Sequence, residues 1–248
     1  MSGYVLYGFV KSGWMVLGGL SGVGNRGIDA LRLQELALIV GEFEESFIDA
    51  SPENLMGHQQ VIAELARRAP ILPFAFGTLS PSKAAAERLL RLNHSAAARR
   101  LVYLEGKHQY SLNVLWADMK AILDEIVREN REIRVARDQL LKVPTAQTYS
   151  QRIAVGHRVA EAVGHKRAQE AERLQRKIRS CAVDLTDLSG HEENFVLGVD
   201  VLLAKGAEMR FEKAMQDLDH KTDGRYLLRL RGPEPPLSFS KIQLRVPA

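Results

Sequence analysis

Cysteine is nearly absent from this chain of 248 residues, in which Cys181 is the only one. A single thiol excludes an intramolecular disulfide and a cysteine-based zinc cluster, and it is typical of a protein in a reducing compartment. No apolar run reaches the roughly 20 residues that cross a bilayer, and no basic segment precedes an apolar core at the N-terminus. We therefore expect a cytoplasmic protein that does not bind a membrane.

A strong charge of one sign is also lacking. The formal net charge is +4 at pH 7, with 34 Lys and Arg against 30 Asp and Glu. Such a mildly basic chain is compatible with nucleic acid and equally with an acidic partner surface, so charge alone selects neither. The apolar content of 46% is that of an ordinary globular protein, and the length suffices for one large domain or two modest ones.

Motifs of catalysis and metal binding are missing. The chain has no Gly-Lys-Ser/Thr phosphate loop, no His-Glu-x-x-His and no nucleophile with a nearby base in sequence. Residues 22–27 match Gly-x-Gly-x-x-Gly, the pattern of a dinucleotide site. Such a site needs a helix directly after the glycines, but the segment before the next expected strand is too short for one. We interpret the glycine run as a mobile loop, and Glu42, Glu44 and Glu45 as a solvated strand end. The sequence predicts a protein that is not an enzyme and needs no cofactor or metal, with a nucleotide-dependent enzyme as the least favoured alternative.

The first 116 residues predict an α+β domain. Helices are expected at 51–69 and 80–104, and strands at 3–10, 15–20, 35–40, 71–76 and 109–116. Strand 71–76 is almost wholly apolar, which predicts the most central place in the sheet. The order of strands and helices indicates a sheet with its helices on one face, close to a ferredoxin-like fold. His58, on the first helix, has no identifiable partner, so we interpret it as packing between helix and sheet.

From residue 117 the pattern changes to an apolar residue every seventh position, as in a coiled coil. One helix is expected with an interruption at Glu129, and a second from Ser150 to about Leu188. A short polar loop that contains Pro144 joins them, so the pair should form an antiparallel hairpin over residues 117–188. The repeating positions of the first helix are Met119, Ile126, Ile133 and Leu140.

The second helix of this hairpin is basic. Residues 152–179 carry eight Arg or Lys and three Glu. A basic helix can lie along nucleic acid, but aromatic residues that stack on bases are missing and the acids are interleaved. We favour the solvated face of a coiled coil, and we keep a nucleic-acid-binding adaptor as the alternative function.

The last part of the chain, residues 193–248, predicts a strand–helix–strand unit with a proline-rich tail. Strands are expected at 195–203 and 225–230 around a helix at 208–220, with room for another strand between the two. Gly232 and the prolines that follow it forbid continuation as helix or central strand. The tail therefore forms an arm, and Leu237 and Phe239 give it two apolar anchors. The second domain spans residues 117–248.

Two motifs resemble those of the gas vesicle protein F/L family, which are accessory proteins of gas vesicle formation. Residues 232–239 have the pattern Gly-Pro-x-Pro-Pro-x-Ser-Phe, which is similar to the ending of the family. Residues 71–78 resemble its internal Leu-Pro-x-Arg-Phe-Gly-Thr motif, with Ala75 in place of the usual Arg. Aromatic residues of the family are replaced by Glu234 and Leu237. Order and spacing agree across nearly the whole chain.

The resemblance implies a modified ferredoxin-like N-terminal domain and a gas vesicle protein of the cytoplasm. It implies that such a protein binds the small hydrophobic shell-forming protein and other accessory vesicle proteins to assist assembly. A place as a minor component of the finished vesicle is a further expectation. The unpaired edge of either sheet and the apolar residues of the tail are the candidate contact surfaces. The candidate partner-binding residues are Pro73, Phe76, Gly77, Thr78, Gly232, Pro233, Pro235, Pro236, Leu237 and Phe239.

Overall fold

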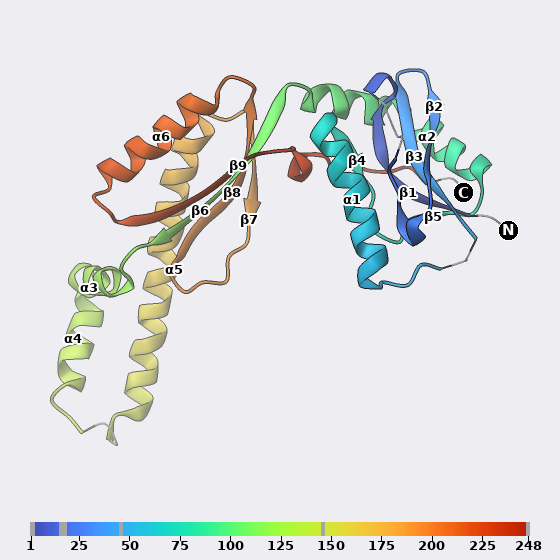
Figure 1. The fold of residues 1–248 in the computed structure, drawn as a ribbon. Coiled ribbons are helices and arrows are strands. Elements are labelled where there is room, and N and C mark those ends of the chain that lie inside the picture. Colours follow the sequence, from blue (N-terminus) through green and yellow to red (C-terminus); the bar gives the residue numbers. More distant parts are fainter. Residues whose placement is uncertain (1–2, 15–18, 45–46, 145–146, 247–248) are drawn as a thin grey trace. The chain divides into compact units, whose positions relative to one another are not determined.

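The computed structural model describes residues 3–14, 19–44, 47–144 and 147–246, and the chain divides into two compact units (Figure 1). Unit 1 consists of Met1–Gln109 and Pro233–Ala248, and unit 2 of Tyr110–Gly232. This division differs from the expected one at residue 116, because the strand before residue 116 lies mainly in unit 2 and the tail belongs to unit 1. The expected strand 15–20 falls largely on residues 15–18, outside the described residues.

Unit 1 holds a sheet in which β1 is central. The strand order is β2-β3-β1-β4, and β5 pairs with β1 as well. The strand at 71–76 was expected to be the most central, and this is wrong: β4 has three residues and ends the order. Its apolar character reflects burial instead, since Ile71 and Leu72 are 2% and 3% exposed. The strands are β1 (Gly3–Lys11), β2 (Ile28–Leu33), β3 (Leu36–Phe43), β4 (Ile71–Pro73) and β5 (Leu79–Ser80).

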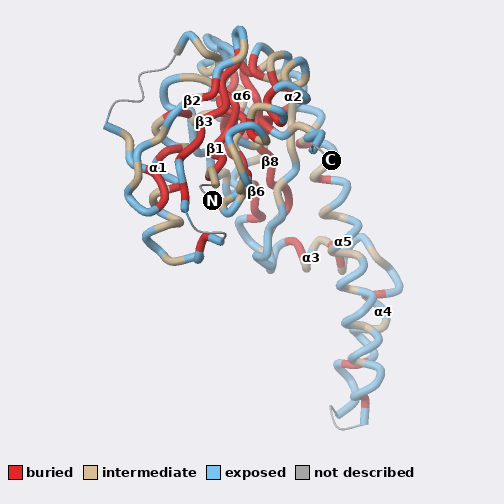
Figure 2. The backbone as a smooth tube through the Cα atoms, turned by 90° about the vertical axis from the view of Figure 1, so that its right-hand side faces the viewer, coloured by how far each residue is buried: buried red, intermediate tan, exposed pale blue. Residues whose placement is uncertain are grey.

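The two helices of unit 1, α1 (Pro52–Arg68) and α2 (Lys83–Leu104), cover opposite faces of this sheet (Figure 2). Val61 of α1 shares a core with Ile39 of β3. Leu38 and Val40 alternate with Ile39 and are equally buried, and α2 contacts β1, β2 and β3. Since neighbouring strand residues point to opposite faces, the expectation of helices on one face is wrong.

Unit 2 contains a four-stranded sheet in the order β7-β8-β6-β9. Without the hairpin helices α3 and α4, its elements follow in the order strand, helix, strand, strand, helix, strand. This connectivity defines ferredoxin-like sheets, so the pattern expected of the first domain is found in the second unit. The elements are β6 (Lys107–Trp116), α3 (Met119–Glu129), α4 (Arg131–Leu140), α5 (Tyr149–Arg179), β7 (Asp184–Leu188), β8 (Phe195–Ala204), α6 (Glu208–Lys221) and β9 (Tyr226–Glu234).

The helical hairpin of unit 2 is formed by α3 and α4 on one side and α5 on the other (Figure 1). The break between α3 and α4 falls at Asn130, one residue from the interruption expected at Glu129. In contrast, α5 ends at Arg179 rather than near Leu188, because residues 184–188 pair antiparallel with β8 as strand β7. Ile178 of α5 belongs to the core of this sheet, so the C-terminal half of α5 covers the sheet.

Candidate partner-binding site

The two motif segments of unit 1 lie against each other. The tail forms a short 3-10 helix, η4 (Leu237–Phe239), which contacts β4. Phe239 is 1% exposed, and the Gln109 side chain accepts a hydrogen bond of 3.0 Å from the Ser238 amide. Phe239 therefore anchors the tail in unit 1, whereas Leu237 is 37% exposed and accessible to a partner.

The first motif builds the turn that joins β4 to β5. Thr78 donates to the Ala75 carbonyl from both its hydroxyl and its amide, at 2.7 and 3.2 Å. Gly77 has φ of 80°, a left-handed conformation that L side chains rarely adopt. Pro73 ends β4, and the ring of Phe76 contacts that of His58 edge to face at 5.6 Å. These contacts give the motif a role in shaping unit 1, and its role in partner binding stays a prediction.

The second motif begins on an edge strand. β9 continues to Glu234 through Gly232 and Pro233, beyond the strand expected at 225–230. Proline is tolerated there because β9 is an edge of the second sheet, where one side of the strand needs no donor. Beyond the strand, the Pro235 carbonyl accepts from the Leu237 amide at 2.8 Å, and Pro236 is buried.

His58 packs between helix and sheet, as expected. It is 4% exposed, and its ring is stacked on that of Tyr7 with centroids 5.3 Å apart. Burial lowers the pKa of His58, which favours the neutral imidazole. Burial also raises the pKa of Tyr7, whose hydroxyl accepts a hydrogen bond of 2.9 Å from the Val23 amide. Among the described residues, the Nε2 of His58 has no hydrogen-bond partner.

The glycine run at 22–27, expected to be a mobile loop, forms hydrogen bonds with two other segments of unit 1. Residues Val23–Asn25 form the short 3-10 helix η2, and the Asn54 side chain accepts from the Gly24 amide at 3.1 Å. A Cβ on Gly22 would lie 2.0 Å from the Tyr7 hydroxyl oxygen. β2 begins directly after Gly27, so no helix follows that could receive a pyrophosphate.

β2 forms one edge of the sheet of unit 1, and no other strand in the described part of the chain pairs with its outer side. β2 pairs with β3 through a two-residue turn that places Leu33 opposite Leu36. Hydrogen-bonded and free residues alternate in such a hairpin, and the Ala30 amide bonds to the Asp29 carboxylate at 2.7 Å instead of to β3. The amides of Ala30 and Arg32 therefore face the unpaired side. A hollow of about 500 Å³ lies beside this strand. Its lining is mainly polar and consists of Tyr4, Arg26, Gly27, Ile28, Asp29, Leu31, Glu42 and Lys83.

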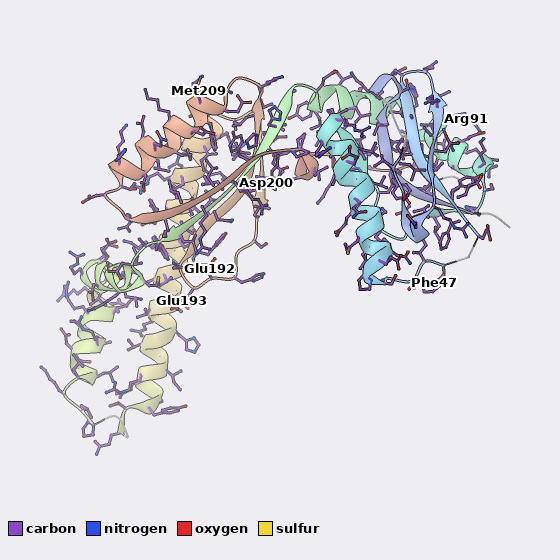
Figure 3. The ribbon with its side chains drawn as sticks, in the orientation of Figure 1. Phe47, Arg91, Glu192, Glu193, Asp200 and Met209 are labelled. Atoms are coloured by element: carbon purple, nitrogen blue, oxygen red, sulfur yellow. The ribbon has the colours of Figure 1, made fainter. Side chains whose placement is uncertain are left out.

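The edges of the second sheet carry charged side chains and a proline. On β9, Arg229 forms a 2.6 Å ion pair with Glu192, which Figure 3 labels, and Pro233 has no amide to donate. On β7, the Asp184 carboxylate accepts from the Leu185 amide at 2.9 Å. Charged side chains and proline are the usual means of blocking an edge. The Asp29 carboxylate bonds to the Ala30 amide of β2 in the same way as Asp184 does on β7, so β2 differs from β9 chiefly in having no proline.

Exposed large apolar side chains are scattered over both units. Phe47 in unit 1 and Met209 in unit 2, both labelled in Figure 3, are 69% and 81% exposed. Single exposed apolar residues are normal on soluble proteins and need no partner. They add no second candidate site.

A buried network of charges in unit 2 was not foreseen from the sequence. The Glu170 carboxylate accepts from Trp116 Nε1 at 2.7 Å and from the Tyr226 hydroxyl at 2.8 Å, and it pairs with Arg225. Burial alone would raise the pKa of Glu170, but these hydrogen bonds outweigh it and lower the pKa. Arg225 also holds Glu125 of α3 through both oxygens, at 2.7 and 2.9 Å. The network joins α3 and α5 to the sheet. Its charged and polar groups form hydrogen bonds and ion pairs with one another, so we do not propose it as a binding site.

Much of the positive charge of α5 is likewise used within unit 2. Lys166 pairs with Glu125 and Glu129, and Arg176 pairs with Glu172. Arg152, Arg167 and Arg173 donate to the Leu140 carbonyl, the Glu193 carbonyl and the Tyr226 hydroxyl, respectively. These five cations belong to the eight counted between residues 152 and 179, which leaves a smaller free surface for nucleic acid.

Clusters of metal-binding side chains and membrane-spanning helices are both absent from the described residues. No group of three or more His, Cys, Asp or Glu residues there could hold a metal ion. In the same residues, every helix is too short or too polar to cross a membrane.

Comparison with known proteins identifies the family. The family described as "Gas vesicle synthesis protein GvpL/GvpF" matches residues 3–241. Gas vesicle protein F of Streptomyces sp. (strain CB03234) is 29% identical over 245 residues, which cover 96% of this chain and 99% of that protein. Gas vesicle protein F of Nostoc sp. (strain PCC 7120 / SAG 25.82 / UTEX 2576) is 20% identical, with 97% and 99% covered.

Solved structures show the same fold. The crystal structure of the gas vesicle protein GvpF from Anabaena sp. PCC7120 has a TM-score of 0.79 at 20% identity, and covers 98% of this chain and 100% of that one. The GvpF structure from Microcystis aeruginosa has a TM-score of 0.70 at 16% identity, with 97% and 99% covered. The resemblance noted in the sequence is confirmed, and the chain belongs to the gas vesicle synthesis protein GvpL/GvpF family.

Proposed function

We propose that this protein is a non-enzymatic assembly factor that binds the small hydrophobic shell-forming protein of gas vesicles. Membership of the family makes it an accessory protein of the gas vesicle system. Shell subunits expose apolar surface before they polymerise, so a partner that covers this surface keeps them soluble and available for nucleation. Binding to other accessory vesicle proteins is part of the same proposal.

The observation that carries this proposal is the free edge of β2 beside its hollow. The amides of Ala30 and Arg32 face the unpaired side, where an incoming strand can bond to them. The hollow of about 500 Å³ next to β2 is lined by Ile28 together with the charged Arg26, Asp29, Glu42 and Lys83, so main-chain hydrogen bonds to β2 supply the contact with an added strand. The bond from Ala30 to Asp29 protects the edge when no partner is present, and it opens when a strand is added.

A pair of variants at one exposed position tests this proposal. Arg32→Pro removes an amide that faces the free edge and leaves the β2–β3 pairing, whereas Arg32→Val removes the same charge and keeps the amide. We expect Arg32→Pro to lose the shell protein in an affinity pull-down, while Arg32→Val retains it. Equal retention by both folded variants would contradict strand addition at β2.

The tail provides a second contact of the same proposal. Leu237 is 37% exposed, next to the buried Phe239. Leu237→Ser should weaken capture of the shell protein without unfolding unit 1. A deletion of the tail is less suitable, because it would also remove the buried Phe239 from unit 1. Unchanged capture would restrict the tail to a structural role.

A further inference from the structure

A groove of about 1050 Å³ lies in unit 1 between α2 and the tail segment 241–245. Asn93 of α2, 1% exposed, fixes this segment through its side-chain amide. Its Oδ1 accepts from the Arg245 amide and its Nδ2 donates to the Arg245 carbonyl, both at 2.8 Å. Phe239 and Ser240 are buried and hold the other end of the segment. Helix α2 and the tail segment 241–245 therefore form the two walls of the groove without a bound ligand.

All charged side chains that line the groove are positive. Arg99 and Arg100 project from α2, and Lys241 and Arg245 from the tail, while no Asp or Glu belongs to its lining. Within the described part of the chain, none of these four side chains forms an ion pair. The Nε of Arg100 is buried there without a hydrogen-bond partner. A concave surface with several unneutralised cations concentrates positive potential and attracts anionic groups.

The remaining lining distinguishes between anionic partners. The ring of Tyr103 has the Arg100 guanidinium 5.0 Å and the Lys107 ammonium 4.9 Å from its centroid. These cations compete with the stacking of a nucleic-acid base on that ring. Leu92 and Leu244, 47% and 40% exposed, give the groove an apolar rim that suits the side chains of a peptide.

We propose that this groove binds an acidic segment of a partner protein, in which several Asp or Glu residues are interspersed with apolar residues. The carboxylates pair with Arg99, Lys241 and Arg245, and the apolar residues lie on Leu92 and Leu244. This site is separate from the free edge of β2 and does not rest on binding of the shell protein.

The test uses the full chain and two peptides of equal length that carry fluorescein. One has Glu-Glu-Leu repeats and the other Gln-Gln-Leu repeats. The groove variant combines Arg99→Gln, Lys241→Gln and Arg245→Gln, which leave the backbone bonds to Asn93 in place. The control variant Arg158→Gln, Lys177→Gln and Arg179→Gln removes the same charge from exposed positions of α5. Fluorescence anisotropy gives the Kd of each pair.

We expect the Glu peptide to bind and the Gln peptide not to bind. The groove variant should weaken binding of the Glu peptide by about tenfold or more, and the control variant by less than about twofold. Should the groove variant lose its native circular dichroism, Lys241→Gln is compared with Lys177→Gln in the same way. Equal weakening by groove and control variants would overturn the proposal, as would absence of binding at low salt. A single-stranded oligothymidylate that binds more tightly than the Glu peptide and competes with it for the groove would also overturn the proposal. The partner of the groove would then be nucleic acid.

Discussion

The side chain of Asn93 and the backbone of Arg245, 152 positions apart, form a pair of 2.8 Å hydrogen bonds that resembles the pairing of two strands. Asn93 is almost fully buried and also donates to the Leu89 carbonyl at 2.8 Å. Because each polar group of its amide is used, Asn93 ties the tail to α2.

Replacement of Asn93 should release the tail. Asn93→Leu has a similar volume but offers neither donor nor acceptor, so the Arg245 amide and carbonyl lose their partners. We expect amide exchange in residues 241–246 to accelerate by about tenfold or more, which corresponds to a loss of about 1.4 kcal/mol in local stability. Hydrogen exchange with mass spectrometry measures this, and peptides of β7 and β8 serve as the internal control. Unchanged exchange of the tail would show that Phe239 alone holds it.

The loop at Gly22 should not accept a side chain. Gly22→Ala places a Cβ 2.0 Å from the Tyr7 hydroxyl oxygen, and we expect destabilisation of unit 1 by about 1–3 kcal/mol. Gly27→Ala is the matched control, because nothing lies within 4 Å of its Cβ. That variant should change stability by less than about 0.5 kcal/mol. Hydrogen-exchange protection of β1 and β3 provides the measurement. Similar protection in both variants would mean that the loop is not held against Tyr7.

Neutralisation of Glu170 should weaken unit 2. Glu170→Gln keeps the shape but removes the charge beside Arg225. Its single amide oxygen cannot accept from Arg225 as well as from Trp116 and Tyr226, because these bonds use both oxygens of the carboxylate. We expect a loss of about 2–3 kcal/mol. Urea unfolding followed by Trp116 fluorescence in a Trp14→Phe background measures it.

The control for this prediction is Glu172→Gln on the same helix. Glu172 pairs with Arg176 at an exposed position, so its replacement should change stability by less than about 0.5 kcal/mol. A similar decrease in the free energy of unfolding for both variants would contradict a larger stabilising contribution from the buried network.

Unit 2 should also lose stability in acid. Hydrogen bonds from Arg225 lower the pKa of Glu125 from its ordinary value of 4.5 to about 2. A carboxylate with a depressed pKa contributes stability above its unfolded pKa, and this contribution is lost as the pH falls through the folded value. We therefore expect the urea midpoint of unit 2 to fall between pH 4.5 and about 2. Glu125→Gln should flatten this dependence, and an equally steep dependence in that variant would assign it to other carboxylates.

Local patterns predicted much of the fold. The helices expected at 51–69, 80–104 and 208–220 are present as α1, α2 and α6, because a capping residue or an apolar period marks each of them. The membership of a strand in one sheet or the other could not be predicted. β6 has the alternation of a strand, but its neighbours β8 and β9 lie far along the chain.

The errors have specific physical causes. Residues 184–188 continue the apolar spacing of α5, yet pairing with β8 makes them a strand. Pro233 ends most strands, but an edge strand needs no donor on its outer side. Asn93 and Glu170 could not be found, since each is one polar residue on a helix and its partners are distant in sequence. The motif residues of 71–78 and 232–239 were found by resemblance, and the structure adds that they contact each other through β4 and η4.

The central claim is that this protein binds the shell-forming protein before it polymerises. The most direct measurement is co-expression of the two chains, followed by affinity pull-down and determination of the soluble fraction of the shell protein. We predict that the shell protein co-purifies, that its soluble fraction rises, and that both effects are lost with Arg32→Pro but not with Arg32→Val. A folded chain that neither captures the shell protein nor raises its soluble fraction would contradict the account.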